Sequence, residues 1–252
     1  MIEQLMNSFW FAEVKDILNN GGQEEIEFLE YLQKFQEGDF ADKEYFVQFF
    51  LNAADDEIFI LGMRLFMAIA SHKDFDLLEG FLEECEEDEL NVFLAYVQES
   101  LSLYAIPYLL ALYETWEETY IGEDIARCIC GMLGQKYIEY ENYDIEQLGD
   151  LFKTFANEHD LDLYYYNGQE FYAGDITKTI IKVAMDCKNR NVQFYADQPS
   201  SILSNSFVLE CPVSNETEID DDKIKELYNY VEKIASIEQT KGEKYFYKNH
   251  IS

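Results

Sequence analysis

Residues capable of catalysis occur in the sequence, but none of them shows the spacing that a familiar chemistry requires. His72, His159 and His250 lie far apart, and there is no HExxH, no Gly-rich phosphate loop and no GxSxG. The acids of "EIDDDK" (218–223) lack the spaced Gly and terminal Glu of a Ca²⁺ loop. The alternating acids of "DLDLY" (160–164) could hold Mg²⁺ at a strand end, but exposed positions of an edge strand explain them better. We therefore expect no catalytic residue, no metal site, no cofactor and no enzymatic activity.

The five cysteines favour free thiols over metal ligands or disulfides. They form no CxxC pair, and Cys128 and Cys130 stand too close for a zinc knuckle, inside the apolar run "IARCICGML". The N-terminal segment "MIEQLMNSFWFAEVKD" lacks the basic and apolar regions of a signal peptide. No apolar run approaches the ~20 residues needed to cross a bilayer. These features predict a cytoplasmic protein that does not associate with membranes.

The most unusual pattern is a concentration of acids at two places, mixed with aromatic residues. Within "FLEECEEDELNVF" (81–93), seven consecutive positions carry six acids and one cysteine, and "YETWEETYIGED" (113–124) is acidic and aromatic. Aromatic anchors among charged groups are typical of protein interfaces. We predict a partner-binding surface, called the acidic ridge below, formed by Glu83, Glu84, Glu86, Glu87, Asp88, Glu89, Tyr113, Glu114, Trp116, Glu117, Glu118 and Tyr120. The alternative is an edge that is simply solvated.

Helical periodicity dominates the chain before the ridge. "EEIEFLEYLQKF" (24–35) places apolar residues on one face, and "DKEYFVQFFLNAA" follows with Asp42 as a candidate N-cap. "DDEIFILGMRLFMAIAS" (55–71) is apolar nearly all round, which predicts a central buried helix capped by Asp55.

A long helix followed by a shorter one then recurs. The openings "DDEI" (55–58), "EDEL" (87–90) and "GEDI" (122–125) are 32 and 35 residues apart, the period of two-helix solenoid repeats. We interpret residues 55–156, with 24–54 as a possible extension, as HEAT-like, and an irregular helical bundle is the alternative. Stacked repeats would place equivalent joints along one edge, and this would align the two acidic stretches.

The chain after Asp160 changes period. Asn167-Gly168 between two short β-like runs predicts a hairpin. We expect helices at 175–190, capped by Asp175, and at 222–238, with strands at 191–196, 206–213 and 244–249. The predicted fold class is mainly α: HEAT-like stacked helix pairs followed by a small α/β C-terminal part. The predicted domains are a helical region, 1–157, and an α/β region, 158–252.

The charge of the chain limits its partners. The 51 acids outnumber the 18 basic residues, for a formal net charge of −33. Such a chain repels nucleic acid and anionic membranes, whose binders present basic surfaces. We expect a basic protein as the partner, unless the charge serves solubility alone.

The acidic composition, the helical pattern and the stretch "NGQEFYAGDITK" (167–178) together resemble the immunity proteins of bacterial polymorphic toxin systems, and among them the family numbered forty-seven. The resemblance spans most of the chain and implies a stoichiometric inhibitor that blocks a cognate toxin, a nuclease among the candidates. Families of this kind share no catalytic residues, so the resemblance assigns none in this sequence. Two other functions stay open: a helical-repeat scaffold or adaptor that binds host proteins, and a DNA mimic that inhibits a nucleic-acid-binding protein.

Overall fold

The computed structural model describes residues 22–136, 143–194, 197–214 and 216–251, and they form two compact units. The helical unit comprises the described residues of 40–171 with Ile251. The split unit combines the described residues of 22–39 and 172–250. The fold is mainly helical, with a few short strands towards the C-terminus, so the predicted fold class is confirmed. The boundaries of these units do not coincide with the predicted boundary at residue 157. The division into domains 1–157 and 158–252 stays a prediction.

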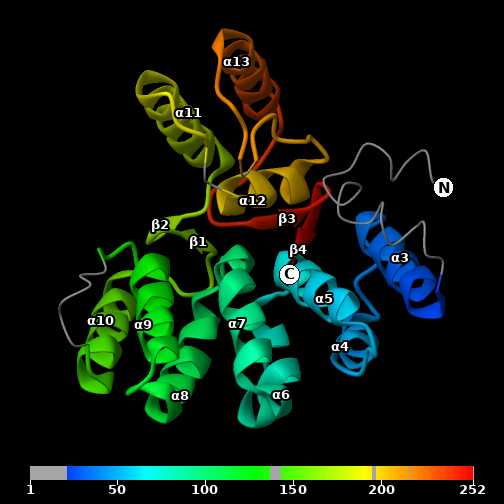
Figure 1. The fold of residues 1–252 in the computed structure, drawn as a ribbon, viewed down its shortest axis with the longest axis vertical. Coiled ribbons are helices and arrows are strands. Elements are labelled where there is room, and N and C mark those ends of the chain that lie inside the picture. The colour runs from blue at the N-terminus through cyan, green and yellow to red at the C-terminus, as the bar shows by residue number, and fades with distance from the viewer. Residues whose placement is uncertain (1–21, 137–142, 195–196, 215, 252) are drawn as a thin grey trace. The chain divides into compact units, whose positions relative to one another are not determined.

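The helical unit contains two series of neighbouring helices (Figure 1). The first consists of α5 (Asp56–Ile69), α7 (Glu87–Tyr96) and α9 (Tyr120–Met132), and each contacts the next. The second consists of α6 (Glu79–Glu84), α8 (Ile106–Trp116) and α10 (Ile145–Glu158), again with contacts between neighbours. Helix α4 (Lys43–Leu51) packs against α5, and 3₁₀ turns at 72–78, 97–100 and 103–105 complete the connections.

Three hydrogen bonds between successive helix pairs join residues that are 30–34 positions apart in the sequence. The Tyr108 hydroxyl donates to Asp76 Oδ1 at 2.6 Å, and the two residues are 32 positions apart. The Tyr113 hydroxyl donates to the Tyr143 carbonyl, 30 positions on. The Cys128 thiol donates to the backbone oxygen of Leu94 across 34 positions. This geometry is compatible with the predicted period, while the assignment to HEAT-like repeats stays a prediction.

The expected helix starts follow from local chemistry. Asp55 caps α5 by accepting a hydrogen bond from the Glu57 amide at 2.8 Å, as predicted. Asp42 stands at the N-cap of α4 without a side-chain cap bond. Helix α5 is buried along nearly its whole length, which confirms the predicted central helix. Its one buried cation, Arg64, faces the buried carboxylate of Glu99, with Nε and Oε2 3.8 Å apart.

The predicted hairpin is present after α10. Strands β1 (Tyr165–Tyr166) and β2 (Gln169–Glu170) pair in antiparallel fashion around Asn167 and Gly168, whose φ angles are 49° and 71°. Left-handed backbone at both central positions is the geometry for which Asn-Gly is favoured.

The split unit contains α3 (Gln23–Gln36), α11 (Ala173–Arg190), α12 (Asp197–Phe207), α13 (Asp221–Ala235) and the hairpin β3–β4 (Lys244–Phe246, Asn249–Ile251). Helix α11 contacts both α12 and α13, and α12 also contacts β3. The Asn249 side-chain amide donates to the Gln36 carbonyl at 3.0 Å, which links the two chain segments of this unit.

Four predictions for the second half are wrong. The strand at 206–213 is replaced by the end of α12, where Val208 adopts a left-handed φ of 58° and stops the helix. The strand at 191–196 reduces to one bridge between Phe194 and Thr217, and residues 195–196 lie outside the described part.

The other two corrections concern a cap and a turn. Helix α11 begins at Ala173, so Asp175 is a first-turn residue that pairs with Lys178 at 2.7 Å and not the N-cap. The single strand at 244–249 is a hairpin, because Tyr247 and Lys248 both have positive φ and turn the chain.

Candidate partner-binding site

The first acidic joint lies where α6 ends and α7 begins. Glu86 is the N-cap of α7, and its amide donates to Glu89 Oε2 at 2.8 Å in a capping box. Glu87 and Asp88 occupy the first turn, where the helix dipole favours negative charge. Glu84 is the last residue of α6, the end at which negative charge is unfavourable. The acids at the start of α7 therefore have a local structural role, whereas Glu84 is exposed without one.

The second joint lies between α8 and α9. Trp116 is the last residue of α8 and is half-buried, while Glu117 and Glu118 are exposed. Tyr120 begins α9 and is 54% exposed. Tyr113 is only 4% exposed and its hydroxyl is bonded within the unit, so it supports the joint from inside and presents no ring to a partner.

The two joints are direct neighbours. The Tyr120 hydroxyl donates to Glu87 Oε1, and the Asn91 side-chain amide donates to the Tyr120 hydroxyl at 3.4 Å. The hydrogen bond to Glu87 raises the pKa of Tyr120, because the neutral phenol is the donor. Helix packing thus brings the two acidic stretches to one place, the arrangement on which the predicted ridge depends.

The segment of the chain that forms the ridge contains no basic residue. Between Lys73 and Arg127 the sequence has 15 Asp and Glu and no Lys, Arg or His. Among the described residues, the ion pairs of this segment are Lys43–Asp74, Arg64–Glu99 and Arg127–Asp124, and none of them involves an acid of the ridge. Within the described ranges no ion pair therefore neutralises an acid of the ridge, and its negative field is screened by solvent ions.

A groove of about 560 Å³ lies between α6 and α8, beside the ridge. Its apolar surface comes from Leu82, Pro107, Ala111 and Leu112, and its rim carries the exposed carboxylates of Glu79 and Glu83, with the aromatic rings of Tyr108 and Trp116. Sequence reasoning found Glu83 and Trp116 but missed Glu79 and Tyr108. Their signal was the spacing, since Glu79 and Glu83 are four apart and Tyr108 and Trp116 eight apart on their helices.

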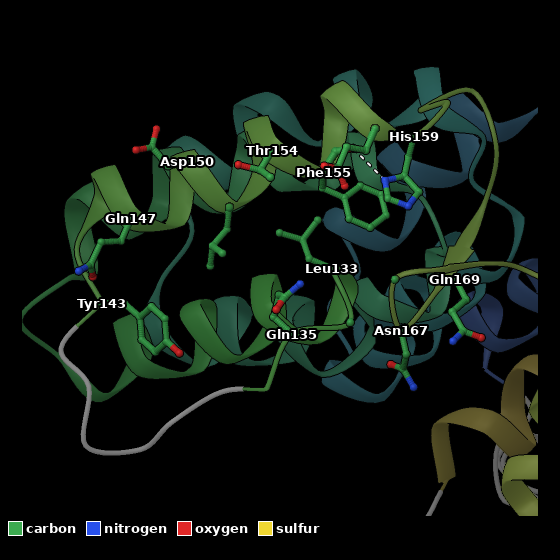
Figure 2. A pocket seen from close by; sticks show the side chains of 14 residues that line it. Leu133, Gln135, Tyr143, Gln147, Asp150, Thr154, Phe155, His159, Asn167 and Gln169 are labelled. Atoms are coloured by element: carbon green, nitrogen blue, oxygen red, sulfur yellow. Dashed lines mark hydrogen bonds between the residues drawn. The ribbon is translucent and has the colours of Figure 1, made fainter.

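A second hollow, of about 790 Å³, lies in the corner between α9, α10 and the β1–β2 turn (Figure 2). Figure 2 shows Gln147, Asp150 and Thr154 along α10, with Leu133 and Gln135 opposite them at the end of α9. His159 stacks on Phe155 with ring centroids 3.9 Å apart, and its Nδ1 lies 3.0 Å from the Phe155 carbonyl oxygen. This histidine is therefore held by its own helix.

The described ranges contain no candidate metal centre. No group of three or more His, Cys, Asp or Glu is placed to hold a metal ion within the part of the chain that the structure describes. His72 lies between Ser102 Oγ and the Asp162 carbonyl oxygen, at 2.7 and 3.0 Å. Burial raises the pKa of Cys85 and of Cys128 to about 11, which makes these thiols poor nucleophiles.

A search of curated proteins gives no match, and neither does a search of solved structures. Among the described helices, none combines the length and apolarity that crossing a membrane requires. A family model described as Immunity protein 47 matches residues 7–251, nearly the entire sequence. The chain therefore belongs to the Immunity protein 47 family.

Proposed function

We propose that this protein neutralises a cognate bacterial toxin by binding it stoichiometrically, without catalysing a reaction. Membership in an immunity-protein family supports the toxin-neutralising role. The observation that carries the binding surface is the junction of the two acidic joints through Tyr120 and Glu87, in a segment without basic residues. A basic toxin surface is complementary to this field, and a nuclease, which binds phosphate with basic groups, is one such toxin.

The charge and the aromatic side chains have different roles in this proposal. Long-range attraction by the ridge speeds the encounter with a basic partner and weakens as salt is added. Packing against the half-buried Trp116 and the exposed Tyr120 slows dissociation. Nucleic acid and anionic membranes are repelled by the same field. The five free cysteines support action in a reducing cytoplasm.

Identification of the partner comes first. The tagged chain is purified from its native host at low and high salt, and the bound proteins are identified by mass spectrometry. One stoichiometric basic protein, encoded beside this chain and toxic without it, supports the immunity function. Several unrelated host proteins support the adaptor function and contradict the proposal.

The ridge is then tested with the purified toxin by charge reversal. Glu84, Asp88 and Glu117 are exposed, so the triple change to Lys leaves the capping box and the Tyr120–Glu87 hydrogen bond in place. We expect the association rate constant to fall about tenfold or more at low salt, with a flatter salt dependence. The control replaces three acids outside the ridge by Lys and changes the net charge equally: Glu44, Glu57 and Glu146. Equal rates in the two variants would remove the ridge from the interface.

A further inference from the structure

The groove between α6 and α8 is built from two helical stripes of different chemistry. On α6, Glu79, Leu82 and Glu83 follow the spacing of one helix face, with the apolar residue between the acids. On α8, Tyr108, Leu112 and Trp116 repeat every four residues and likewise share a face. The groove therefore joins an apolar, partly aromatic wall to a pair of carboxylates.

The two carboxylates of the groove repel one another in the free protein. Glu79 and Glu83 are four apart on α6, and like charges at this spacing destabilise a helix. Both are exposed, and no Lys or Arg of the described ranges lies within ion-pair distance of either one. The nearby carboxylate of Asp76, unlike those of Glu79 and Glu83, already accepts a hydrogen bond from the Tyr108 hydroxyl at 2.6 Å. A cation placed between Glu79 and Glu83 would relieve their repulsion.

We propose that this groove receives an arginine side chain of the toxin, an inference that rests on the proposed function. A guanidinium group is planar, stacks on aromatic faces and binds carboxylates through two parallel hydrogen bonds. Trp116 offers the aromatic face, Glu79 and Glu83 offer the carboxylates, and Leu82 with Ala111 covers the carbon stem. A lysine ammonium ion carries the same charge but lacks a planar group that can stack on a ring and form two parallel hydrogen bonds to a carboxylate.

The dimensions of the groove agree with this occupant. Its volume of about 560 Å³ leaves ample room for a single arginine side chain. The absence of positive charge from residues 74–126 leaves no internal lysine or arginine in this segment to compete for the carboxylates. Charge complementarity and the aromatic wall together select arginine over a purely apolar anchor.

The test uses the tryptophan in the groove as its reporter. The chain has two tryptophans, Trp10 and Trp116, so the full-length Trp10→Phe protein emits from Trp116 alone. The probe is a capped hexa-arginine peptide, with hexa-lysine as the comparison at equal charge. We expect a saturable change in Trp116 emission with hexa-arginine, and about fivefold or more weaker binding of hexa-lysine. No saturable change, or equal affinity for both peptides, would overturn the inference.

Paired charge removals locate the bound peptide. Glu79→Gln with Glu83→Gln should weaken hexa-arginine binding about tenfold, while Glu44→Gln with Glu57→Gln should change it less than about twofold. Circular dichroism establishes that both variants keep the helical content of the parent. Equal losses in the two pairs would show binding to the general field and would overturn the inference.

The outcome is separable from that of the proposed function. A chain that neutralises its toxin while hexa-arginine leaves Trp116 unchanged would refute the groove and leave the immunity function standing. A chain that binds hexa-arginine at the groove but no toxin would refute the immunity function and the toxin as the source of the arginine, while the preference of the groove for arginine would stand.

Discussion

Replacing Gly168 by alanine should destabilise the corner of the helical unit that forms the hollow in Figure 2. Gly168 has a φ of 71°, and its amide donates to the Met132 carbonyl at 3.0 Å. A Cβ atom at this position would lie 2.5 Å from the backbone oxygen of Leu133, and a backbone oxygen cannot rotate away as a side chain can. The hairpin turn therefore packs directly on the end of α9.

The expected loss of stability has two components. A left-handed backbone costs an L-residue about 1–2 kcal/mol relative to glycine. Inserting a carbon atom into a closely packed contact costs about 1–3 kcal/mol more. Together they predict a loss of about 2–5 kcal/mol in the free energy of unfolding. For a chain of this length each kcal/mol shifts the melting temperature by about 2–4 °C, so the expected decrease is about 4–20 °C.

Thermal melts followed by circular dichroism measure the effect, with Gly149→Ala as the matched control. Gly149 lies within α10, and nothing lies within 4 Å of a Cβ built there, so alanine should stabilise that helix by about 0.5–1 kcal/mol. The same chemical change should thus have opposite signs at the two positions. A melting temperature of Gly168→Ala equal to or above that of the parent would refute the close packing of turn and helix.

The remaining predictions concern a tyrosine, two thiols and a buried ion pair. Burial and the hydrogen bond to Asp76 raise the pKa of Tyr108 to about 12, so its contribution to stability is complete below pH ~10 and is lost as the pH rises through ~12. Tyr108→Phe should therefore flatten the free energy of unfolding between those pH values, and an unchanged slope would contradict this. With pKa values of about 11, Cys85 and Cys128 should react with a thiol reagent at pH 8 at least roughly tenfold more slowly than in the unfolded chain, because the smaller thiolate fraction outweighs the greater nucleophilicity of a more basic thiolate; timed labelling and mass spectrometry would show the difference. Glu99→Gln removes the charge that faces Arg64 and should cost about 3–5 kcal/mol in chemical denaturation, whereas a loss below about 1 kcal/mol would mean that the pair is dispensable.

The elements that were predictable from the sequence are those specified by local signals. Asp55 and Asp144 cap their helices as their types suggest, and Asn167-Gly168 makes the turn for which this pair is favoured. The long helix at 55–71 was recognisable because an apolar run of that length exceeds what a strand needs. In each case the information lies within a few residues.

The elements that failed are those decided by distant contacts. Helix α12 contains four serines, which are poor helix formers; all four are buried here, and the helix packs against α11 and β3. The aromatic and β-branched residues that follow indicate a strand by composition, yet the chain turns at Val208. Tertiary packing overrides propensity at such places.

The candidate site likewise has features that local sequence indicates and features that depend on distant contacts. Composition alone pointed to the two acidic joints, but their meeting through Tyr120 and Glu87 depends on how α7 and α9 pack. The burial of Tyr113 follows from its contact with Tyr143, 30 residues on, which no local pattern indicates. The hollow in Figure 2 combines three separate segments, and their meeting depends on tertiary packing that no local pattern indicates.

The sequence separations of the contacts have a consequence for synthesis on the ribosome. In the helical unit the hydrogen bonds between successive helix pairs span about one pair, as between Tyr108 and Asp76, and the bond from His72 to the Asp162 carbonyl spans 90 positions. The helix pairs can therefore dock one after another, and the segment that contains Asp162 joins them later. The split unit differs, because Asn249 bonds to Gln36 across 213 positions. Its N-terminal helix α3 must wait until nearly the whole chain has been translated. The helical unit, which carries the ridge and the groove, is thus able to form first, while the split unit closes last.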